Sequence, residues 1–252
     1  MDLNLKGRVA LVTGGGRDVG REISTVLARE GAFVAVNYRN SESEAAEVIA
    51  EIEKQGGRAK AYKADIANYD DVKKMVAEVA KDFGGLDILV NNAGFVITQK
   101  FTDSKPEDRK RQLDVCLYGA IHCCHAAAPH LNARKQGRII SFSGDSSRVG
   151  ESNLAMAAAG RAGVIALMKS LAKEFGRFGT TANTLSLGLI ETSHSNKAWL
   201  DENRDKILRQ YAIRRLGKPE DVGGAVAFLA SDHGQWITGQ VLSINGGFAM
   251  VG

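Results

Sequence analysis

The sequence of 252 residues has no tyrosine between Tyr118 and Tyr211, and it contains only three prolines and three cysteines. So few prolines, without any break in composition, give no sign of a linker between domains. With 44% hydrophobic residues the chain is long enough to bury one large core. We therefore predict a single nucleotide-binding domain over residues 1–252.

The three cysteines, Cys116, Cys123 and Cys124, fall on one predicted helix. An odd number of cysteines on one helix does not describe a disulfide framework, so reduced and buried thiols are the simplest interpretation. The run from His122 to His125 looks like a metal site, but two adjacent cysteines point in different directions around a helix. We therefore predict no bound metal.

The chain also lacks a basic stripe with interleaved aromatic residues, an apolar signal segment, and an apolar run of the roughly 18 residues that span a bilayer. Its 33 basic residues are interspersed with 29 acidic ones, which gives a formal net charge of +4. These absences argue against nucleic-acid and membrane partners and favour a small-molecule ligand. They also predict a cytoplasmic protein.

Short apolar strands alternate with amphipathic helical patterns along the whole chain. The predicted strands are residues 9–13, 33–37, 59–63, 87–90, 138–142, 181–185 and 241–244, and the predicted helices after the first are residues 42–54, 69–82, 106–131, 154–175 and 221–230. Such alternation favours parallel strands joined by helical crossovers. The expected fold is α/β, a Rossmann-type doubly wound sheet of about seven parallel strands with helices on both faces.

A glycine-rich turn at residues 13–20 joins the first strand to the first helix. Glycines there let the backbone approach a pyrophosphate, and the helix N-terminus offers N–H groups and a positive dipole end. In this strand, turn and helix context the motif predicts a dinucleotide site.

Together these motifs resemble the short-chain dehydrogenase/reductase family, including its 3-oxoacyl-ACP-reductase-like members. Residues 13–20 resemble its T-G-x-x-x-G-x-G turn, residues 91–94 its N-N-A-G motif, residues 183–188 its N-x-x-x-P-G segment, and residues 221–247 its closing run. The resemblance implies an oxidoreductase that forms a dimer or tetramer through the helices carrying Cys116 and Arg161. The cofactor-binding residues that it implies are Gly14, Gly16, Arg17, Asp18, Val19, Gly20, Asn37, Arg39, Asp65, Ile66, Asn92, Ala93, Gly94, Arg161, Gly188, Ile190 and Thr192.

The residues after the second strand bear on which dinucleotide binds. An acid there would accept the ribose hydroxyls of NAD and repel a 2′-phosphate, but the chain has Asn37 followed by Tyr38 and Arg39. Arg39 and Arg17 can flank a phosphate, so NADP(H) is favoured over NAD(H). The alternative is that both arginines only solvate the surface. Asp18 replaces the middle glycine of the turn, and its charge must point away from the phosphates.

The family's catalytic residues are a tyrosine, a serine, a lysine and an asparagine. Alignment on the flanking residues 137–140 and 162–163 places these roles on Ala157, Gly144, Arg161 and Cys116. Arg161 keeps the positive charge but cannot shuttle a proton at neutral pH. Because the first two replacements remove volume and polarity, we expect a larger and more apolar cavity beside the nicotinamide position.

The identity of a replacement proton donor stays open. Polar residues on nearby loops are candidates: Asp145, Ser143, Ser146, Ser147, Glu151 and His194. Ser143 is the weakest of them if the strand continues through it, because adjacent strand residues point to opposite faces.

Three functions are compatible with these residues. The first is an NADP(H)-dependent oxidoreductase that transfers hydride to or from a carbonyl, imine or activated alkene without the tyrosine acid. The second is a catalytically inactive binding protein, which is either a ligand-occupied sensor or a subunit that pairs with a competent relative. The third is a cofactor-free lyase on the same fold.

Overall fold

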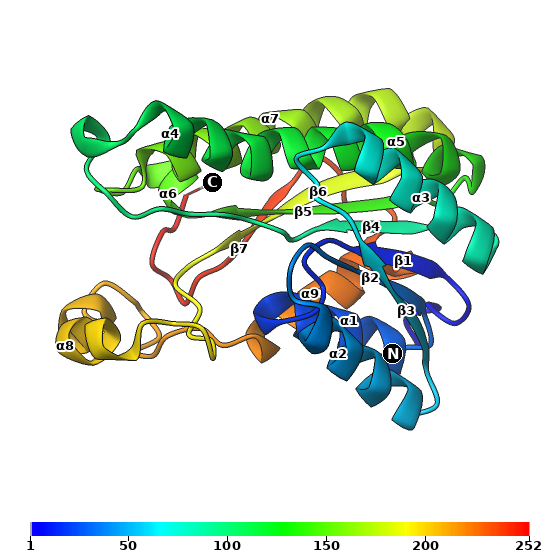
Figure 1. The fold of residues 1–252 in the computed structure, drawn as a ribbon, viewed down its shortest axis with the longest axis horizontal. Coiled ribbons are helices and arrows are strands. Elements are labelled where there is room, and N and C mark those ends of the chain that lie inside the picture. The colour runs from blue at the N-terminus through cyan, green and yellow to red at the C-terminus, as the bar shows by residue number, and fades with distance from the viewer. Residues whose placement is uncertain (1, 252) are drawn as a thin grey trace.

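Seven parallel strands form one sheet in the order β3-β2-β1-β4-β5-β6-β7 in the computed structural model, which describes residues 2–251 (Figure 1). The strands are β1 (Val9–Val12), β2 (Phe33–Tyr38), β3 (Arg58–Lys63), β4 (Ile88–Asn91), β5 (Arg138–Gly144), β6 (Thr181–Leu187) and β7 (Val241–Ile244). All six neighbouring pairs are parallel. The predicted doubly wound Rossmann-type sheet is therefore confirmed.

Helices cover both faces of the sheet (Figure 1). One layer holds α1 (Asp18–Arg29), α2 (Glu42–Lys54) and α9 (Glu220–Ala230), and the other holds α3 (Tyr69–Phe83), α5 (Gly119–Ala133) and α7 (Ala155–Phe175). The other helical segments are α4 (Pro106–Leu113), α6 (Ser146–Val149), α8 (Lys197–Leu208), η1 (Phe101–Asp103), η2 (Asp114–Tyr118), η3 (Gly176–Phe178) and η4 (Asp232–Gly234). In Figure 1, α8 stands away from both layers.

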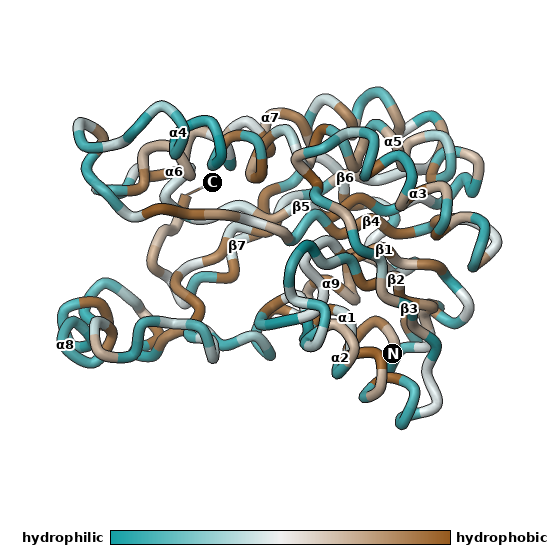
Figure 2. Tube along the Cα trace, viewed as in Figure 1, coloured by the Kyte–Doolittle hydropathy of each residue, from teal (hydrophilic) through white to brown (hydrophobic). Residues whose placement is uncertain are grey.

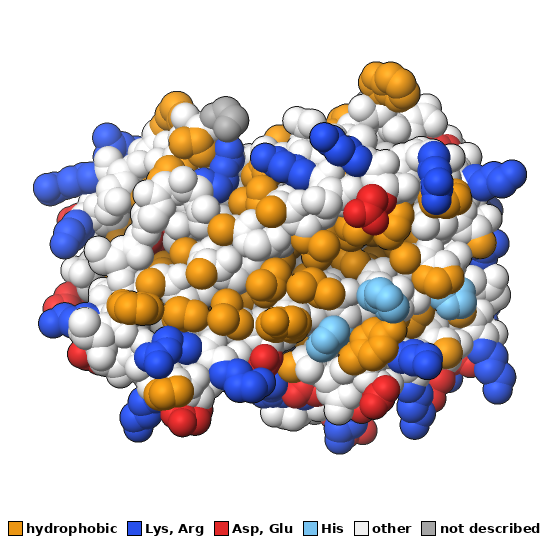
Figure 3. Space-filling model, turned by 90° about the horizontal axis from the view of Figure 1, so that it is seen from above, with side chains coloured by type: hydrophobic (Ala, Val, Ile, Leu, Met, Phe, Trp, Pro, Cys, Tyr) orange, Lys and Arg blue, Asp and Glu red, His pale blue; other side chains and the backbone are white. Residues whose placement is uncertain are grey.

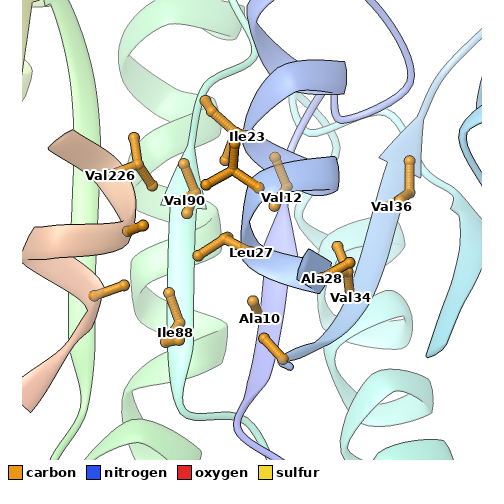
Figure 4. Packing of buried hydrophobic residues seen from close by; sticks show 14 of the residues in the cluster. Ala10, Val12, Ile23, Leu27, Ala28, Val34, Val36, Ile88, Val90 and Val226 are labelled. Carbon is orange, nitrogen blue, oxygen red and sulfur yellow. The ribbon is translucent and has the colours of Figure 1, made fainter. Parts of the chain in front are cut away.

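Two hydrophobic clusters lie on the two faces of the sheet. Successive strand residues face opposite sides, so Val12 packs toward α1 while the neighbouring Leu11 packs toward the α3 and α5 layer. Ile23 and Leu27 of α1 meet alternate residues of β1, β2 and β4 in the first cluster (Figure 4). Because both faces are covered, hydrophobic residues run along the central strands, with hydrophilic ones at the outer turns (Figure 2).

The helical predictions need two additions. The long helix predicted at residues 106–131 is present without a break, but it contains the π-helical turn η2 between α4 and α5. The wide turn lies where Cys116 packs against α7, since a Cβ added to Gly160 would be only 3.2 Å from the Cys116 Cβ. Helix α8 was not predicted at all, because Leu200 is its only buried residue and no apolar period marks it.

The expectation that no segment is apolar enough to cross a membrane also needs correction. By length and composition one helical stretch, Ala155–Phe178, passes that test with a mean hydropathy of 1.3. Scattered charges such as Arg161 and Lys169 interrupt any uncharged run there, which is why the sequence pattern did not reveal it. In the fold this stretch includes α7, which packs against the sheet through Val164, Met168 and Ala172.

Candidate functional site

A cavity of about 470 Å³ opens at the carboxyl ends of β1, β2 and β4. The strand order reverses between β1 and β4, and parallel sheets form a ligand crevice at such a point. Most residues predicted to bind the cofactor line this cavity: Gly14, Arg17, Asp18, Val19, Gly20, Asn37, Arg39, Asp65, Ile66, Asn92, Ala93 and Gly94.

The remaining predicted residues lie elsewhere. Gly16 faces α2, where an added Cβ would be 3.0 Å from the Ala45 Cα. Gly188 and Ile190 line a second cavity of about 350 Å³. Thr192 belongs to a tight loop in which its backbone N–H donates to Ser195 Oγ at 2.9 Å.

Backbone geometry and lack of space explain why the turn has glycine at positions 14 and 20. Gly14 has φ of +61°, in the left-handed region that favours glycine. At Gly20 an added Cβ would lie 2.0 Å from the Gly14 carbonyl oxygen and 2.8 Å from Asn92 Nδ2. Arg17 is the N-cap of α1, and its side chain makes no capping hydrogen bond. The first N–H groups of α1 therefore lack a side-chain partner and lie at the cavity, as a phosphate would require.

Two side-chain amides hold this turn in place. Asn92 Nδ2 donates to the carbonyl oxygens of Thr13 and Gly14 at 3.0 and 3.2 Å. Asn37 is 2% exposed; its Oδ1 accepts from the Gly14 N–H at 3.2 Å, and its Nδ2 donates to the Ala64 carbonyl oxygen at 3.1 Å. The Asn37 amide is thus occupied by backbone groups, and its role is to tie β2 to the turn.

Three arginines approach the cavity from different elements. Arg17 comes from the turn, Arg39 from the end of β2 and Arg111 from α4. Asp65 joins two of them, since its Oδ2 lies 3.1 Å from Arg111 Nη2 and 3.7 Å from Arg39 Nη1. Sequence reasoning missed Arg111, although it stands four residues before Val115, which also lines the cavity, on the same side of the helix.

His194 lies at the turn rather than beside the position of the absent tyrosine. Its Nδ1 is 2.9 Å from Asp18 Oδ1 and its Nε2 is 3.2 Å from Glu44 Oε1. Both ring nitrogens are therefore engaged by carboxylates at one wall of the cavity. This geometry does not support the predicted role of His194 as a replacement proton donor.

The positions assigned to the family's serine and tyrosine lie outside this cavity. A side chain at Gly144 would have room, since an added Cβ meets Ser146 Oγ at 3.6 Å and the Leu187 carbonyl oxygen at 3.8 Å. Ala157 is 3% exposed and does not line this cavity. The expected enlarged cavity is not formed at Ala157.

Arg161 and Cys116, at the other two positions, are held by backbone groups. Arg161 Nη1 donates to the Phe142 carbonyl oxygen at 3.1 Å, and a Cβ added to Gly94 would lie 2.4 Å from Arg161 Nη2. The guanidinium thus rests against the cavity residue Gly94. Cys116 Sγ donates to the Phe95 carbonyl oxygen at 3.2 Å.

Most of the other proposed acids are occupied. Strand β5 continues through Ser143, which is 2% exposed and lies 2.6 Å from Ser147 Oγ. Asp145 is 3% exposed and accepts from Ser186 Oγ and Asn245 Nδ2 at 2.7 and 2.6 Å. Neither side chain lines the dinucleotide cavity.

Ser146 and Glu151 complete this set. Ser146 is 8% exposed. Glu151 is exposed, and partial desolvation together with the charge of Asp145 raises the pKa of its carboxyl group. An acid that keeps its proton to a higher pH is better suited to donate it near neutrality.

Sequence reasoning did not name Tyr211 as a site residue, because Tyr211 lies at the end of the tyrosine-free stretch, far from the position expected for a catalytic tyrosine. Its hydroxyl accepts from the Leu189 N–H at 2.8 Å, and burial raises the pKa of the phenol. A tyrosine thus reaches the loop after β6 from beyond α8, a contact that spacing along the chain does not indicate. It lines the second cavity with Gly188 and Asn245.

The cysteine and histidine run on α5 serves packing. Cys123 and Cys124 are buried, and burial raises the pKa of both thiols, that of Cys124 to about 12. His122 Nδ1 is 3.0 Å from the Ile66 carbonyl oxygen, and His125 Nδ1 is 2.7 Å from the Tyr69 hydroxyl. Residues 2–251 contain no group of three or more His, Cys, Asp or Glu side chains arranged to hold a metal ion.

Comparison with known proteins adds independent information about the whole chain. A family model described as enoyl-(acyl carrier protein) reductase matches residues 15–249. The 3-oxoacyl-[acyl-carrier-protein] reductase FabG of Staphylococcus aureus (strain Mu50) is 40% identical over 241 residues, which cover 96% of this chain and 98% of that protein.

Solved structures agree with the fold. A putative short-chain alcohol dehydrogenase from Sinorhizobium meliloti 1021 has a TM-score of 0.94 and 32% identity, with 98% of both chains covered. A blue fluorescent protein from a metagenomic library, in complex with NADPH, has a TM-score of 0.91 and 30% identity, covering 98% of this chain and 100% of that one.

Proposed function

Because the chain belongs to the short-chain dehydrogenase/reductase family, we propose that it is an NADP(H)-dependent oxidoreductase whose active site works without the usual tyrosine. Its reaction transfers hydride to or from a carbonyl, an imine or an activated alkene. One observation carries the proposal: the glycine turn, the uncapped start of α1 and two arginines converge on one cavity at the strand ends.

The residues of this cavity fit a nicotinamide dinucleotide. The uncapped N–H groups of α1 suit a pyrophosphate, and the absence of a Cβ at Gly20 lets α1 pack closely against the turn at Gly14. Arg17 and Arg39 supply guanidinium groups for a 2′-phosphate, and no acid stands at the end of β2 to repel it. When bound, the nicotinamide supplies or accepts the hydride. The NADPH complex of a relative with 30% identity supports the same cofactor class.

The protein's own residues limit the proton chemistry. Arg161 lies between Gly94 and the Phe142 carbonyl oxygen, where its charge steadies the strand ends but gives no proton at neutral pH. We assign the proton to water, to the substrate or to a loop acid. A lost general acid typically costs about 100- to 10,000-fold in rate, so iminium ions and activated alkenes are favoured substrates.

The test combines binding with turnover. NADPH and NADH affinities are measured by fluorescence titration, and NADPH oxidation is then followed with ketones, cyclic imines and activated alkenes. The proposal expects tighter NADPH binding and turnover of imines or alkenes that exceeds ketone turnover. Ketone reduction at ordinary family rates would contradict the atypical mechanism, and binding without turnover would favour the inactive partner subunit.

An apolar surface supports a homo-oligomer, as either a dimer or a tetramer. Hydrophobic side chains form a band across the face of the helix layer that contains α4, α5 and α7 (Figure 3). Only 28% of the apolar window of α7 is buried within the chain. We expect this face to pair with a second copy. Ala166→Arg, at an exposed position of α7, should then lower the molar mass of the oligomer measured by light scattering. Ala50→Arg, at an exposed position of the opposite helix layer, should leave the molar mass unchanged.

A further inference from the structure

We propose that His194 is a positioning residue that latches the loop after β6 onto the glycine turn and compensates two carboxylates beside the cofactor's phosphates. The cofactor part of this inference rests on the proposed function. It also gives a reason for the aspartate that stands where a glycine is usual in the turn.

The latch joins three elements that are distant in sequence. His194 belongs to the loop that follows β6, Asp18 is the first residue of α1, and Glu44 lies in the first turn of α2. The two nitrogen-to-oxygen distances of His194 are 2.9 Å to Asp18 and 3.2 Å to Glu44. Ser193 adds a weaker contact, since its Oγ lies 3.4 Å from Asp18 Oδ1. One short loop segment thus closes against one wall of the cavity.

The two carboxylates lie where they would oppose a phosphate. Asp18 and Glu44 both line the cavity, and Asp18 stands at the positive end of the α1 dipole. An acid there is stabilised by the dipole but competes with an anionic ligand for the same field. Asp18 also has φ of +50°, in the left-handed region. An anionic ligand therefore binds at the turn most favourably when a positively charged group pairs with the Asp18 carboxylate.

His194 meets this need only when its ring carries two protons. A neutral imidazole has one N–H group, so it can donate to one carboxylate but not to both. The charged groups around the ring are Asp18 and Arg17 of the α1 turn and Glu44 of α2, with Arg17 Nε at 3.9 Å from Asp18 Oδ2. A ring with a single N–H group would leave either Asp18 or Glu44 without a donor.

Two ion pairs hold this loop at different points. Helix α8 begins at Lys197, three residues after His194, and its Arg204 Nη2 lies 3.0 Å from Oε1 of Glu191, nearer the start of the loop. The Glu191 pair therefore ties the loop to α8, whereas the contacts of His194 tie it to the glycine turn. Opening the latch frees the side of the cavity that α1 and α2 form.

The first test needs no cofactor. Hydrogen–deuterium exchange of the free protein is compared for wild type, His194→Gln and the matched control His130→Gln, which lies on α5 across the sheet. Loss of one charge-assisted contact is expected to speed exchange in residues 192–200 by about five-fold. Equal exchange in all three proteins would overturn the latch.

The second test measures the cofactor directly. Stopped-flow dissociation of NADPH is expected to be about five-fold faster in His194→Gln than in wild type, because the two carboxylates lose their contacts with the imidazole. In an Asp18→Gly/Glu44→Gln background, His194→Gln should change neither dissociation nor exchange, because its partners are absent. An undiminished effect in that background would contradict the assigned partners.

The two tests separate the two proposals. If wild type binds neither dinucleotide, the proposed function fails, and the exchange experiment still decides whether the latch exists. If wild type binds NADPH normally and His194→Gln matches it in both measurements, the latch alone is overturned. Faster exchange with unchanged dissociation would overturn the role of His194 toward the cofactor.

Discussion

Gly20 of the glycine turn and Gly144, at the position assigned to the family's serine, are both glycine, but for different physical reasons. At Gly20 an added Cβ would lie 2.0 Å from the Gly14 carbonyl oxygen, so no side chain fits. At Gly144 the nearest atoms to an added Cβ are 3.6 and 3.8 Å away, which is ordinary van der Waals contact. The fold therefore dictates the glycine of the first site and leaves the second free to vary.

This difference separates binding from chemistry. The amide side chains of Asn37 in β2 and of Asn92 just after β4 support the turn from the two sides of β1, so the cavity at the strand ends depends on mutual contacts. At the other end Gly144 and Ala157 bring no polar group of their own. A chain can therefore keep the geometry of a cofactor site while the groups for proton transfer change.

Restoring the proton-transfer end is expected to have the largest effect. The triple variant Gly144→Ser/Ala157→Tyr/Arg161→Lys should reduce simple ketones about 100- to 10,000-fold faster than wild type, because it regains a general acid. The rate is followed as NADPH oxidation at 340 nm. The matched control carries Ala157→Phe instead, which adds the bulk without the hydroxyl. Equal rates for the two triple variants would remove the phenol from the explanation.

Blocking the dinucleotide end should have the next largest effect. Gly20→Ala forces the turn to move and is expected to destabilise the protein by about 1–3 kcal/mol and to abolish measurable NADPH binding. Urea unfolding and fluorescence titration measure the two effects. Gly224→Ala is the control, since nothing lies within 4 Å of an added Cβ there. Gly224→Ala should stabilise the helix by about 0.5–1 kcal/mol. If Gly20→Ala binds NADPH as tightly as wild type does, the steric argument is contradicted.

Charge reversal at Arg39 should change the choice of dinucleotide. Arg39→Asp removes a guanidinium from a 2′-phosphate and supplies an acceptor for ribose hydroxyls, so we expect the NADPH-to-NADH affinity ratio to fall about 10- to 100-fold. The two dissociation constants are measured by fluorescence. Lys173→Asp, at an exposed position of α7 away from the cavity, controls for the change in net charge. An unchanged ratio would mean that Arg39 only solvates the surface.

The smallest predicted effect concerns Glu151 and its dependence on pH. The raised pKa of its carboxyl group means that the folded protein holds this proton more tightly than the unfolded chain. Wild-type stability therefore falls as the pH rises from the ordinary glutamate value through the raised one. Glu151→Gln lacks this loss and should be more stable than wild type at pH 7, by less than about 1 kcal/mol because the side chain is exposed. A gain of the same size at pH 3 would exclude ionisation as its cause.

Sequence patterns were sufficient for the sheet and for most of the turn. The near-continuous apolar strands and the spacing of glycines from 14 to 20 are local features, and each reflects a local constraint. Arg111 and Glu44 reach the cavity from helices whose positions depend on tertiary packing, so no local pattern marked them. Tyr211 and His194 contact elements far along the chain for the same reason.

Calorimetric titration of NADPH into the unmodified protein tests the central claim most directly. We predict saturable binding of one NADPH per chain, tighter than the binding of NADH, in a protein that reduces simple ketones poorly or not at all. A titration that releases no binding heat at several temperatures and leaves the thermal unfolding midpoint unchanged would contradict the account.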